Sequence, residues 1–322
     1  MNVNKPIAYL FPGQGAQYSN MALDLLESDT VKQLFETASD IFEKDVKELL
    51  RSDFNILKRT DISQPAVTIA NLAAYIFLKD KGIKPAVCAG FSLGEYAALV
   101  CAGIINEADC FRLVKTRGNA MQKVIDKHHE NFGDDDLSSP GMAAVVGISI
   151  EQIIPLINQW ITNGLKDLHI ANINSPRQLV ISGTAIALDE AKTRLKEAGI
   201  KRVVRLPVAG PFHSPLISDA VKDFKPVLDT VTFRDPVIPI FSNVTGKMIS
   251  SGSEAKELAI RQITNPVCWV EQETAISISG IEVCLEAGPG GVLQGLWQDM
   301  KTDIPIFAAG TAEDIYKCIS FL

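Results

Sequence analysis

A serine between two glycines is the feature of this sequence with the clearest chemical meaning. Residues 88–103 read CAGFSLGEYAALVCAG, and Ser92 lies between Gly90 and Gly94. This Gly-x-Ser-x-Gly spacing is typical of a nucleophile elbow, a sharp turn from a strand into a helix. Small neighbours permit the strained turn, which presents the hydroxyl at the helix N-terminus, where the N–H of Leu93 can stabilise an oxyanion. The alternative is that Ser92 only caps the helix.

A serine nucleophile needs a base, and the chain has four histidines. His213 is the strongest candidate, because it lies among prolines and small residues in LPVAGPFHSPLI, a segment typical of a functional loop. His128 and His129 lie in a polar stretch and are expected to be solvated. His169 lies in an apolar segment and is expected to be structural.

Short apolar runs separated by helical patterns indicate an α/β protein with a mostly parallel sheet. Helical periodicity predicts helices over 30–42 and 64–82, the second ending at Lys-Asp-Lys-Gly. Continuous apolar runs suit strands buried on both faces. These runs occupy residues 7–13, 86–92, 238–243, 283–289 and 304–310.

A separate pattern in the middle of the chain predicts a small inserted subdomain. Its apolar segments follow the order βαββαβ, a ferredoxin-like unit that is complete in itself. We therefore expect a subdomain over residues 139–207, inserted into a core made of 1–138 and 208–322. The polar stretch 126–141 is the expected linker. The predicted segments are a strand at 141–148, a helix at 151–160, strands at 168–174 and 178–183, a helix at 185–199 and a strand at 201–208.

Composition excludes several classes of protein. The chain has 322 residues, of which 47% are hydrophobic, and a net charge of −7, which disfavours a general nucleic-acid or anionic-membrane binder. No run is long enough for a membrane helix, and the N-terminal apolar run is too short for a signal peptide. The six cysteines are not spaced like zinc ligands, so we expect a reduced, cytoplasmic protein without a metal site.

Several further segments together resemble one family. It comprises the malonyl-CoA:acyl-carrier-protein transacylases and the acyltransferase domains of fatty-acid and polyketide synthases. The resemblance spans nearly the whole chain, and it implies a hydrolase-like parallel-sheet core with an inserted ferredoxin-like subdomain. The segments that carry it are LFPGQGAQ (10–17), GFSLGEYAAL (90–99), NINSPRQLVISG (172–183), PFHSPLI (211–217), NPVCW (265–269) and EAGPGGVL (286–293).

The resemblance implies a ping-pong acyl transfer. Ser92 would attack the thioester of malonyl-CoA while His213 takes its proton, and the thiol of a carrier protein's phosphopantetheine arm would then accept the malonyl group. A main-chain carbonyl at Gln262 would orient the histidine. Gln14 would join Leu93 in the oxyanion hole. The expected partners are malonyl-CoA and an acidic acyl carrier protein, with no permanently bound cofactor, and the family suggests a monomer.

Substrate choice is expected to depend on three further residues. Arg117 matches the family's arginine for the malonyl carboxylate, which a guanidinium can bind through two parallel hydrogen bonds. Phe212 matches the malonyl-selective form, in which the ring fills the space of an α-methyl group. Asn174 is implied as a substrate-binding residue. Phe91 departs from the family, which usually has histidine before the nucleophile.

Three other functions compete with malonyl transfer. An acyl hydrolase of the same fold would clear acyl groups from carrier proteins, but such relatives typically lack an arginine like Arg117. A non-catalytic docking module would not need both Ser92 and His213. A lipase or esterase would want an acid between serine and histidine and a His-Gly-Gly-Gly segment, which is absent. Fatty-acid and polyketide pathways both remain open.

Overall fold

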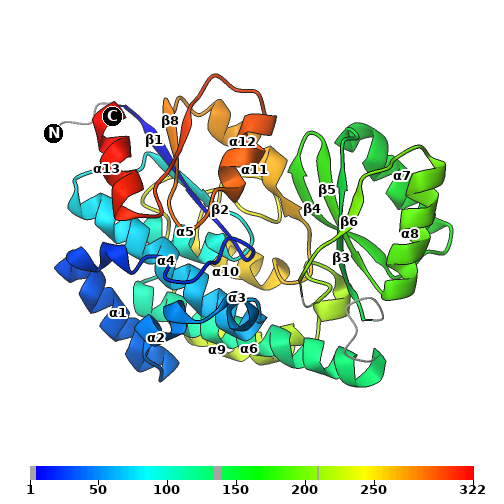
Figure 1. The fold of residues 1–322 in the computed structure, drawn as a ribbon, viewed down its shortest axis with the longest axis horizontal. Coiled ribbons are helices and arrows are strands. Elements are labelled where there is room, and N and C mark those ends of the chain that lie inside the picture. The colour runs from blue at the N-terminus through cyan, green and yellow to red at the C-terminus, as the bar shows by residue number, and fades with distance from the viewer. Residues whose placement is uncertain (1–4, 133–138, 209) are drawn as a thin grey trace.

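The larger part of the molecule is built around a parallel four-stranded sheet (Figure 1). The computed structural model describes residues 5–132, 139–208 and 210–322. The strand order is β2-β1-β8-β9, and every neighbouring pair is parallel. The two ends of the chain therefore meet in one sheet. The strands are β1 (Ile7–Phe11), β2 (Val87–Gly90), β8 (Val283–Glu286) and β9 (Ile306–Ala308).

Strand β1 is buried on both faces, as its continuous apolar run predicts. All five of its residues are buried. Its alternate side chains enter two different core clusters. Ile7, Tyr9 and Phe11 pack on the side of α4 (Thr60–Asp80). The other side chains pack on the side of α11 (Trp269–Ser277) and α12 (Val292–Asp299).

The remaining helices of the core surround this sheet (Figure 1). Helix α1 (Asp29–Phe42) begins where the Ser28 side chain accepts a hydrogen bond from the N–H of Val31, and its buried side chains follow a helical spacing. The prediction of a helix over 30–42 is confirmed. The others are α2 (Val46–Arg51), α3 (Phe54–Leu57), α5 (Gly94–Cys101), α6 (Glu107–Phe132), α9 (Ala220–Thr230), α10 (Gly252–Arg261) and α13 (Ala312–Phe321).

A second, mixed sheet forms the smaller part of the molecule, and its strands β3 to β6 are drawn in shades of green in Figure 1. Its strand order is β6-β3-β5-β4-β7. The first four strands pair antiparallel, whereas β7 runs parallel to β4. Helices α7 (Ile150–Thr162) and α8 (Ala185–Glu197) pack on it through a core cluster of their own. The strands are β3 (Gly141–Val146), β4 (Leu168–Ser175), β5 (Gln178–Gly183), β6 (Val203–Arg205) and β7 (Val267–Cys268).

Two sequence-based predictions of local structure are wrong. Residues 126–132 are not a linker, because α6 continues to Phe132, and His128 and His129 are therefore helical. Residues 238–243 form no full strand: Ile240 makes only an isolated parallel bridge to Cys88. Pro239 has no N–H to donate to a ladder, which accounts for the interruption.

Two features are absent from the residues that the structure describes. No helix among them is long and apolar enough to cross a membrane. Within the same residues, no group of three or more histidine, cysteine, aspartate or glutamate side chains is placed to hold a metal ion. The acidic run 134–136 lies outside the described residues.

Candidate active site

Ser92 lies at the turn between β2 and α5, in a backbone conformation with φ of +50°. The two flanking glycines are required by close packing. A Cβ atom on Gly94 would lie 2.0 Å from the carbonyl oxygen of Phe11, and one on Gly90 would lie 2.1 Å from the carbonyl of Gly94. No side chain fits at either position. The elbow predicted from the sequence is therefore present, and it places the hydroxyl at the N-terminal end of α5.

His213 lies directly beside this serine. The Ser92 hydroxyl donates a hydrogen bond to His213 Nε2, with 2.7 Å between the two atoms. On the other side of the ring, Nδ1 lies 2.9 Å from the carbonyl oxygen of Gln262 and 3.2 Å from that of Asn265. Carbonyl oxygens only accept, so Nδ1 carries the hydrogen and Nε2 is free to accept a proton.

The surroundings of His213 keep its ring neutral. The residue is 4% exposed. Burial lowers the pKa of His213 to about 4, and the positive charge of Arg117 acts in the same direction. The imidazole is therefore in its basic form at neutral pH. Like Ser92, His213 has a left-handed backbone conformation, with φ of +55°. Strain of this kind is common at functional sites.

The side chain of Gln262 connects the two halves of the site. Its amide nitrogen donates to the carbonyl oxygen of Ser92 at 2.9 Å and to the carboxylate of Glu95. Its amide oxygen accepts a hydrogen bond from Arg117 Nη2 at 3.1 Å. The family resemblance implies a role only for the main-chain carbonyl of this residue. The amide fixes that carbonyl against His213 and also contacts the arginine, so its identity matters.

Glu95 and Asn243 stabilise the backbone of the elbow through hydrogen bonds. The Asn243 side chain accepts from the N–H of Ser92 at 2.6 Å and donates to the carbonyl of Gly90 at 2.6 Å. Glu95 accepts from the N–H of Asn243 at 2.9 Å. Burial raises the pKa of Glu95 to about 7 despite these donors. The pair ties the nucleophile to a loop 151 residues further along the chain.

Arg117 is a buried cation without an acidic partner. It is 2% exposed. Its Nη1 donates to Gln64 Oε1 at 2.8 Å and its Nη2 to Gln262, while the Tyr96 ring lies 5.6 Å from Cζ. Within the described residues, no carboxylate is bonded to the guanidinium, and Nε has no acceptor. Burial lowers the pKa of Arg117, but a guanidinium stays protonated at pH 7. Such a site favours an anion from outside.

Gln14 lies in the turn that follows β1, beside the elbow. Its side-chain oxygen accepts a hydrogen bond from the Thr60 hydroxyl at 3.0 Å. Thr60 in turn accepts from Gln64 Nε2 at 2.9 Å, and its backbone N–H donates to Gln122. The turn after β1 is thereby fixed to the N-terminal end of α4. Leu93 is the N-cap residue of α5 and is buried.

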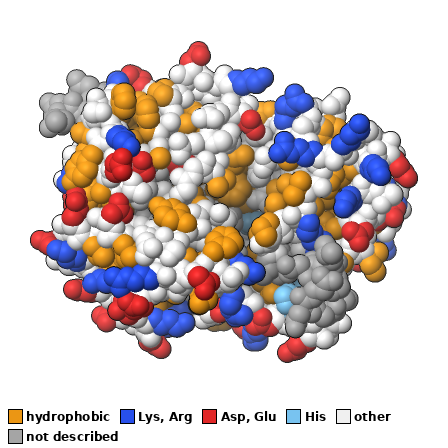
Figure 2. All heavy atoms as spheres, viewed as in Figure 1, with side chains coloured by type: hydrophobic (Ala, Val, Ile, Leu, Met, Phe, Trp, Pro, Cys, Tyr) orange, Lys and Arg blue, Asp and Glu red, His pale blue; other side chains and the backbone are white. Residues whose placement is uncertain are grey.

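One cleft of about 350 Å³ lies between the two sheets, and Figure 2 shows the surface hollowed there. It is lined by Gln14, Gln64, Ser92, Leu93, Arg117 and His213, among others. The core supplies Gln14, Ser92 and Arg117. Phe212, 8% exposed, lines the cleft next to His213. The smaller part supplies neutral and apolar side chains: Met142, Ala144, Asn172, Asn174, Gln178 and Val180.

Asn174 and Phe91 both line this cleft, one with an unpaired polar atom and the other with an aromatic neighbour. Asn174 is 6% exposed, and its Oδ1 accepts no hydrogen bond from any residue that the structure describes. Phe91 packs edge-to-face on Trp269, with 5.3 Å between the ring centroids. The wall beside the nucleophile is therefore aromatic and apolar, where a histidine would offer hydrogen bonds.

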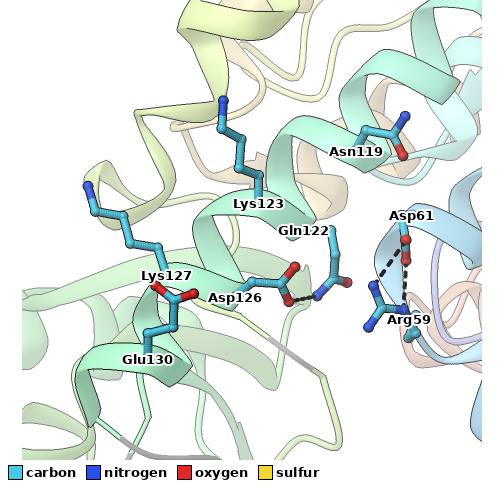
Figure 3. Close-up of a pocket in the computed structure, with 8 residues that line it drawn as sticks. All are labelled: Arg59, Asp61, Asn119, Gln122, Lys123, Asp126, Lys127 and Glu130. Carbon is cyan, nitrogen blue, oxygen red and sulfur yellow. Dashed lines mark hydrogen bonds and ion pairs between the residues drawn. The ribbon is translucent and has the colours of Figure 1, made fainter.

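A second hollow of about 520 Å³ lies outside the active site (Figure 3). It is lined by both acids and bases, and several of them pair with each other. Arg59 binds Asp61 through two hydrogen bonds of 3.1 Å, and Gln122 donates to Asp126 at 2.7 Å. These four side chains are engaged with one another, and Gln122 also accepts a hydrogen bond from the backbone N–H of Thr60.

The site residues predicted from the sequence lie close together in the structure. The buried polar residues that hydrogen-bond to them were not predicted. His128 and His129 lie on α6, and His169 lies in β4. The structure adds Gln64, Glu95 and Asn243 as polar groups buried around the site. Glu95 follows the elbow in the sequence, and a charged residue in an alanine-rich helix was a signal that could have identified it.

The sequence matches one protein-family model and is similar to known proteins over nearly its whole length. The model of the acyl transferase domain family matches residues 8–306. The malonyl CoA-acyl carrier protein transacylase of Bacillus subtilis strain 168 is 34% identical over 318 residues, which cover 98% of this chain and 97% of that protein.

Solved structures agree with these matches. The malonyl CoA-acyl carrier protein transacylase of Clostridium perfringens is similar with a TM-score of 0.89 at 30% identity, covering 98% of this chain and 96% of that one. A malonyl-transacylase solved in complex with its type II PKS acyl-carrier protein has a TM-score of 0.88 at 32% identity, covering 98% of this chain and all of that one.

Proposed function

The chain belongs to the acyl transferase domain family, and we propose that it transfers a malonyl group from malonyl-CoA to the phosphopantetheine thiol of an acyl carrier protein. The observation that carries this proposal is the buried Arg117 in the same cleft as the Ser92–His213 pair. A nucleophile with a neutral base suits acyl transfer. A buried cation without an acid suits an acyl group that ends in a carboxylate.

The first half-reaction loads the enzyme. Ser92 Oγ attacks the thioester carbonyl of malonyl-CoA while His213 Nε2 takes the hydroxyl proton. The oxyanion that forms faces the backbone N–H groups of Gln14 and Leu93. The carbon–sulfur bond then breaks, and the imidazolium returns its proton to the departing coenzyme A thiolate. The product is a malonyl ester on Ser92.

The second half-reaction unloads the enzyme along the reverse path. The phosphopantetheine thiol of the carrier gives its proton to His213 Nε2 and attacks the ester. The same N–H groups stabilise the second oxyanion. The carbon–oxygen bond breaks, and His213 returns the proton to Ser92. The Gln262 carbonyl holds the Nδ1–H side of the ring throughout, which keeps Nε2 pointed at the serine.

Selectivity for malonyl comes from the side chains around the acyl group. The Arg117 guanidinium binds the terminal carboxylate through two charge-assisted hydrogen bonds. Phe212 fills the space next to the α-carbon, which disfavours an α-methyl group by about 1–3 kcal/mol. The free Oδ1 of Asn174 accepts an N–H from an amide of the pantetheine arm.

The architecture and the charge distribution support an acidic carrier as partner. In this proposal, residues 1–138 and 208–322 form a hydrolase-like core, and residues 139–207 form an inserted ferredoxin-like subdomain. The subdomain carries eight lysines and arginines against five acids, within a chain of net charge −7. The basic subdomain therefore attracts an acidic carrier that the core repels. The enzyme acts as a cytoplasmic monomer with no permanently bound cofactor.

Intact-protein mass spectrometry tests the proposal. Malonyl-CoA is expected to add one malonyl group to the wild type and to a Ser253→Ala control, which lacks an exposed serine of α10, but not to Ser92→Ala. Added holo-carrier should then remove the group and become malonylated. If the wild type released free malonate without loading the carrier, the protein would be an acyl hydrolase instead.

A further inference from the structure

The charged side chains of the active-site cleft lie at two different depths. Two residues that line it, Arg117 and Lys58, are permanent cations, and none of the lining residues is an aspartate or glutamate. Arg117 is buried at 2% exposure, whereas Lys58 is exposed to solvent. The cleft therefore presents one positive charge inside and a second one at its solvent-facing edge.

Lys58 is held close to the reacting groups by its position in the chain. It is the C-cap residue of α3 and lies two residues before Thr60, whose hydroxyl contacts Gln14. Its ammonium group forms no ion pair or hydrogen bond with any described residue. The neighbouring Arg59 differs, because it turns to the outer hollow of Figure 3 and is bound to Asp61. Lys58 is thus the available cation of this segment.

We propose that Lys58 binds the phosphate of the 4′-phosphopantetheine arm that both acyl donor and acyl acceptor carry. The proposal rests on the function proposed above. Malonyl-CoA and a holo-carrier share one linear chain with a sulfur atom, two amides and a phosphate; the sulfur is a thioester in malonyl-CoA and a thiol in the holo-carrier. A malonyl thioester of this arm is anionic at its two ends and neutral between them. The cleft matches this order, with Arg117 inside, neutral amides such as Asn174 on the wall and Lys58 at the edge.

The chemistry of the ammonium group suits this role. A lysine binds phosphate as a mobile point charge and needs no fixed bidentate geometry. It can therefore contact a phosphodiester on the carrier and a diphosphate on coenzyme A equally. Because the group stays exposed, the contact is modest and is weakened by salt. It acts on binding in both half-reactions and leaves the reacting atoms unchanged.

Steady-state kinetics of Lys58→Ala and Lys58→Glu test this inference. We expect KM for malonyl-CoA and for holo-carrier to rise about twofold to fivefold with kcat unchanged, and more for the glutamate variant. Raised salt should reduce the difference from wild type. Malonyl-pantetheine, which has no phosphate, should react with wild type and variants at the same rate. Lys47→Glu, an exposed lysine of α2, is the control for net charge and should behave as wild type.

Each other outcome overturns the inference in a recognisable way. If the Lys58 variants lost activity equally with malonyl-pantetheine, Lys58 would only support the turn of Gln14. A rise in KM for the carrier alone would indicate a contact between Lys58 and the carrier protein. A rise in KM for malonyl-CoA alone would indicate a contact between Lys58 and the nucleotide. Unchanged KM values would mean that Lys58 binds nothing. If malonyl-CoA failed to load wild-type Ser92, the proposed function itself would fail, independently of Lys58.

Discussion

The core and the smaller mixed-sheet part contribute different chemistry to the same cleft. Residues outside 139–207 supply the nucleophile, the base, the buried arginine and the buried amides around them. Residues 139–207 supply Asn172, Asn174, Gln178 and apolar side chains, none of which carries a charge. In the proposed function, the core therefore determines reactivity and acyl choice, and the smaller part determines how the rest of the substrate is held.

The two parts also differ in how their side chains are supported. Around Arg117, Gln64 and Gln262 each accept a hydrogen bond from one terminal nitrogen, and further hydrogen bonds lead on to Thr60 and Glu95. The Asn174 Oδ1 atom has no donor among the described residues. A network of several linked hydrogen bonds is rigid and costly to disturb, whereas an isolated unpaired group leaves a place for a ligand. Substitutions in the core should therefore change kcat or acyl selectivity. Substitutions in the cleft wall formed by residues 139–207 should change KM.

Arg117→Ala gives the largest expected effect and tests the core side of the comparison. It should lower kcat/KM for malonyl-CoA by at least about a hundredfold, because two charge-assisted hydrogen bonds to the carboxylate are lost. The rate with acetyl-CoA should stay or rise, since no anion has to be bound. Arg112→Ala, an exposed arginine on the same helix, is the matched control.

A parallel fall in malonyl and acetyl rates would contradict the role of Arg117 in substrate choice. The substitution also leaves the side-chain oxygens of Gln64 and Gln262 without their donor, which costs about 1–3 kcal/mol each in stability. A melting curve for each variant separates this loss of stability from the loss of selectivity.

The pH dependence of the acylation rate is the next effect in size. The pKa of His213 is about 4, below its ordinary value, so the ring remains neutral and basic as the pH falls from 8 to 5. At pH 5 an ordinary histidine would be about 3% neutral, so the rate should be about thirtyfold higher than such a base permits. Stopped-flow loading of Ser92 with malonyl-pantetheine measures this directly.

Glu95 does titrate in this window, because burial raises its pKa to about 7. Glu95→Gln keeps an acceptor for Gln262 and removes the titration. A step near pH 7 that disappears in this variant belongs to Glu95. A step near pH 6.5 that persists in it would mean that His213 is not protected by burial.

The sequence identified the serine and histidine that lie together at the elbow better than the groups that support them. Ser92 and His213 lie in short segments whose residue types indicate their chemistry directly. The partners of Arg117 lie 53 and 145 residues away from it, and Asn243 lies 151 residues from Ser92. Such contacts depend on tertiary packing, which spacing along one chain does not contain. The two-residue strand β7 was missed for the same reason, because its pairing with β4 is long-range.

The length of α6 shows a second limit of the sequence. Its last residues are polar, and this composition suggested a linker. A helix on the surface needs apolar residues only on its inner face. A polar last turn is therefore compatible with a helix as well as with a linker. By contrast, the parallel sheet was well predicted, because strands buried on both faces must be apolar throughout.

Asn174→Ala gives the smallest expected effect and tests the other side of the comparison. Its free Oδ1 is proposed to accept one N–H of the pantetheine arm, and a single neutral hydrogen bond is worth about 0.5–1.5 kcal/mol. KM for malonyl-pantetheine should therefore rise about twofold to tenfold with kcat unchanged. Asn163→Ala, at the exposed end of α7, is the control within the same part of the chain. A fall in kcat of the size seen for core variants would show that this wall takes part in the chemistry, and the division between the two parts would fail.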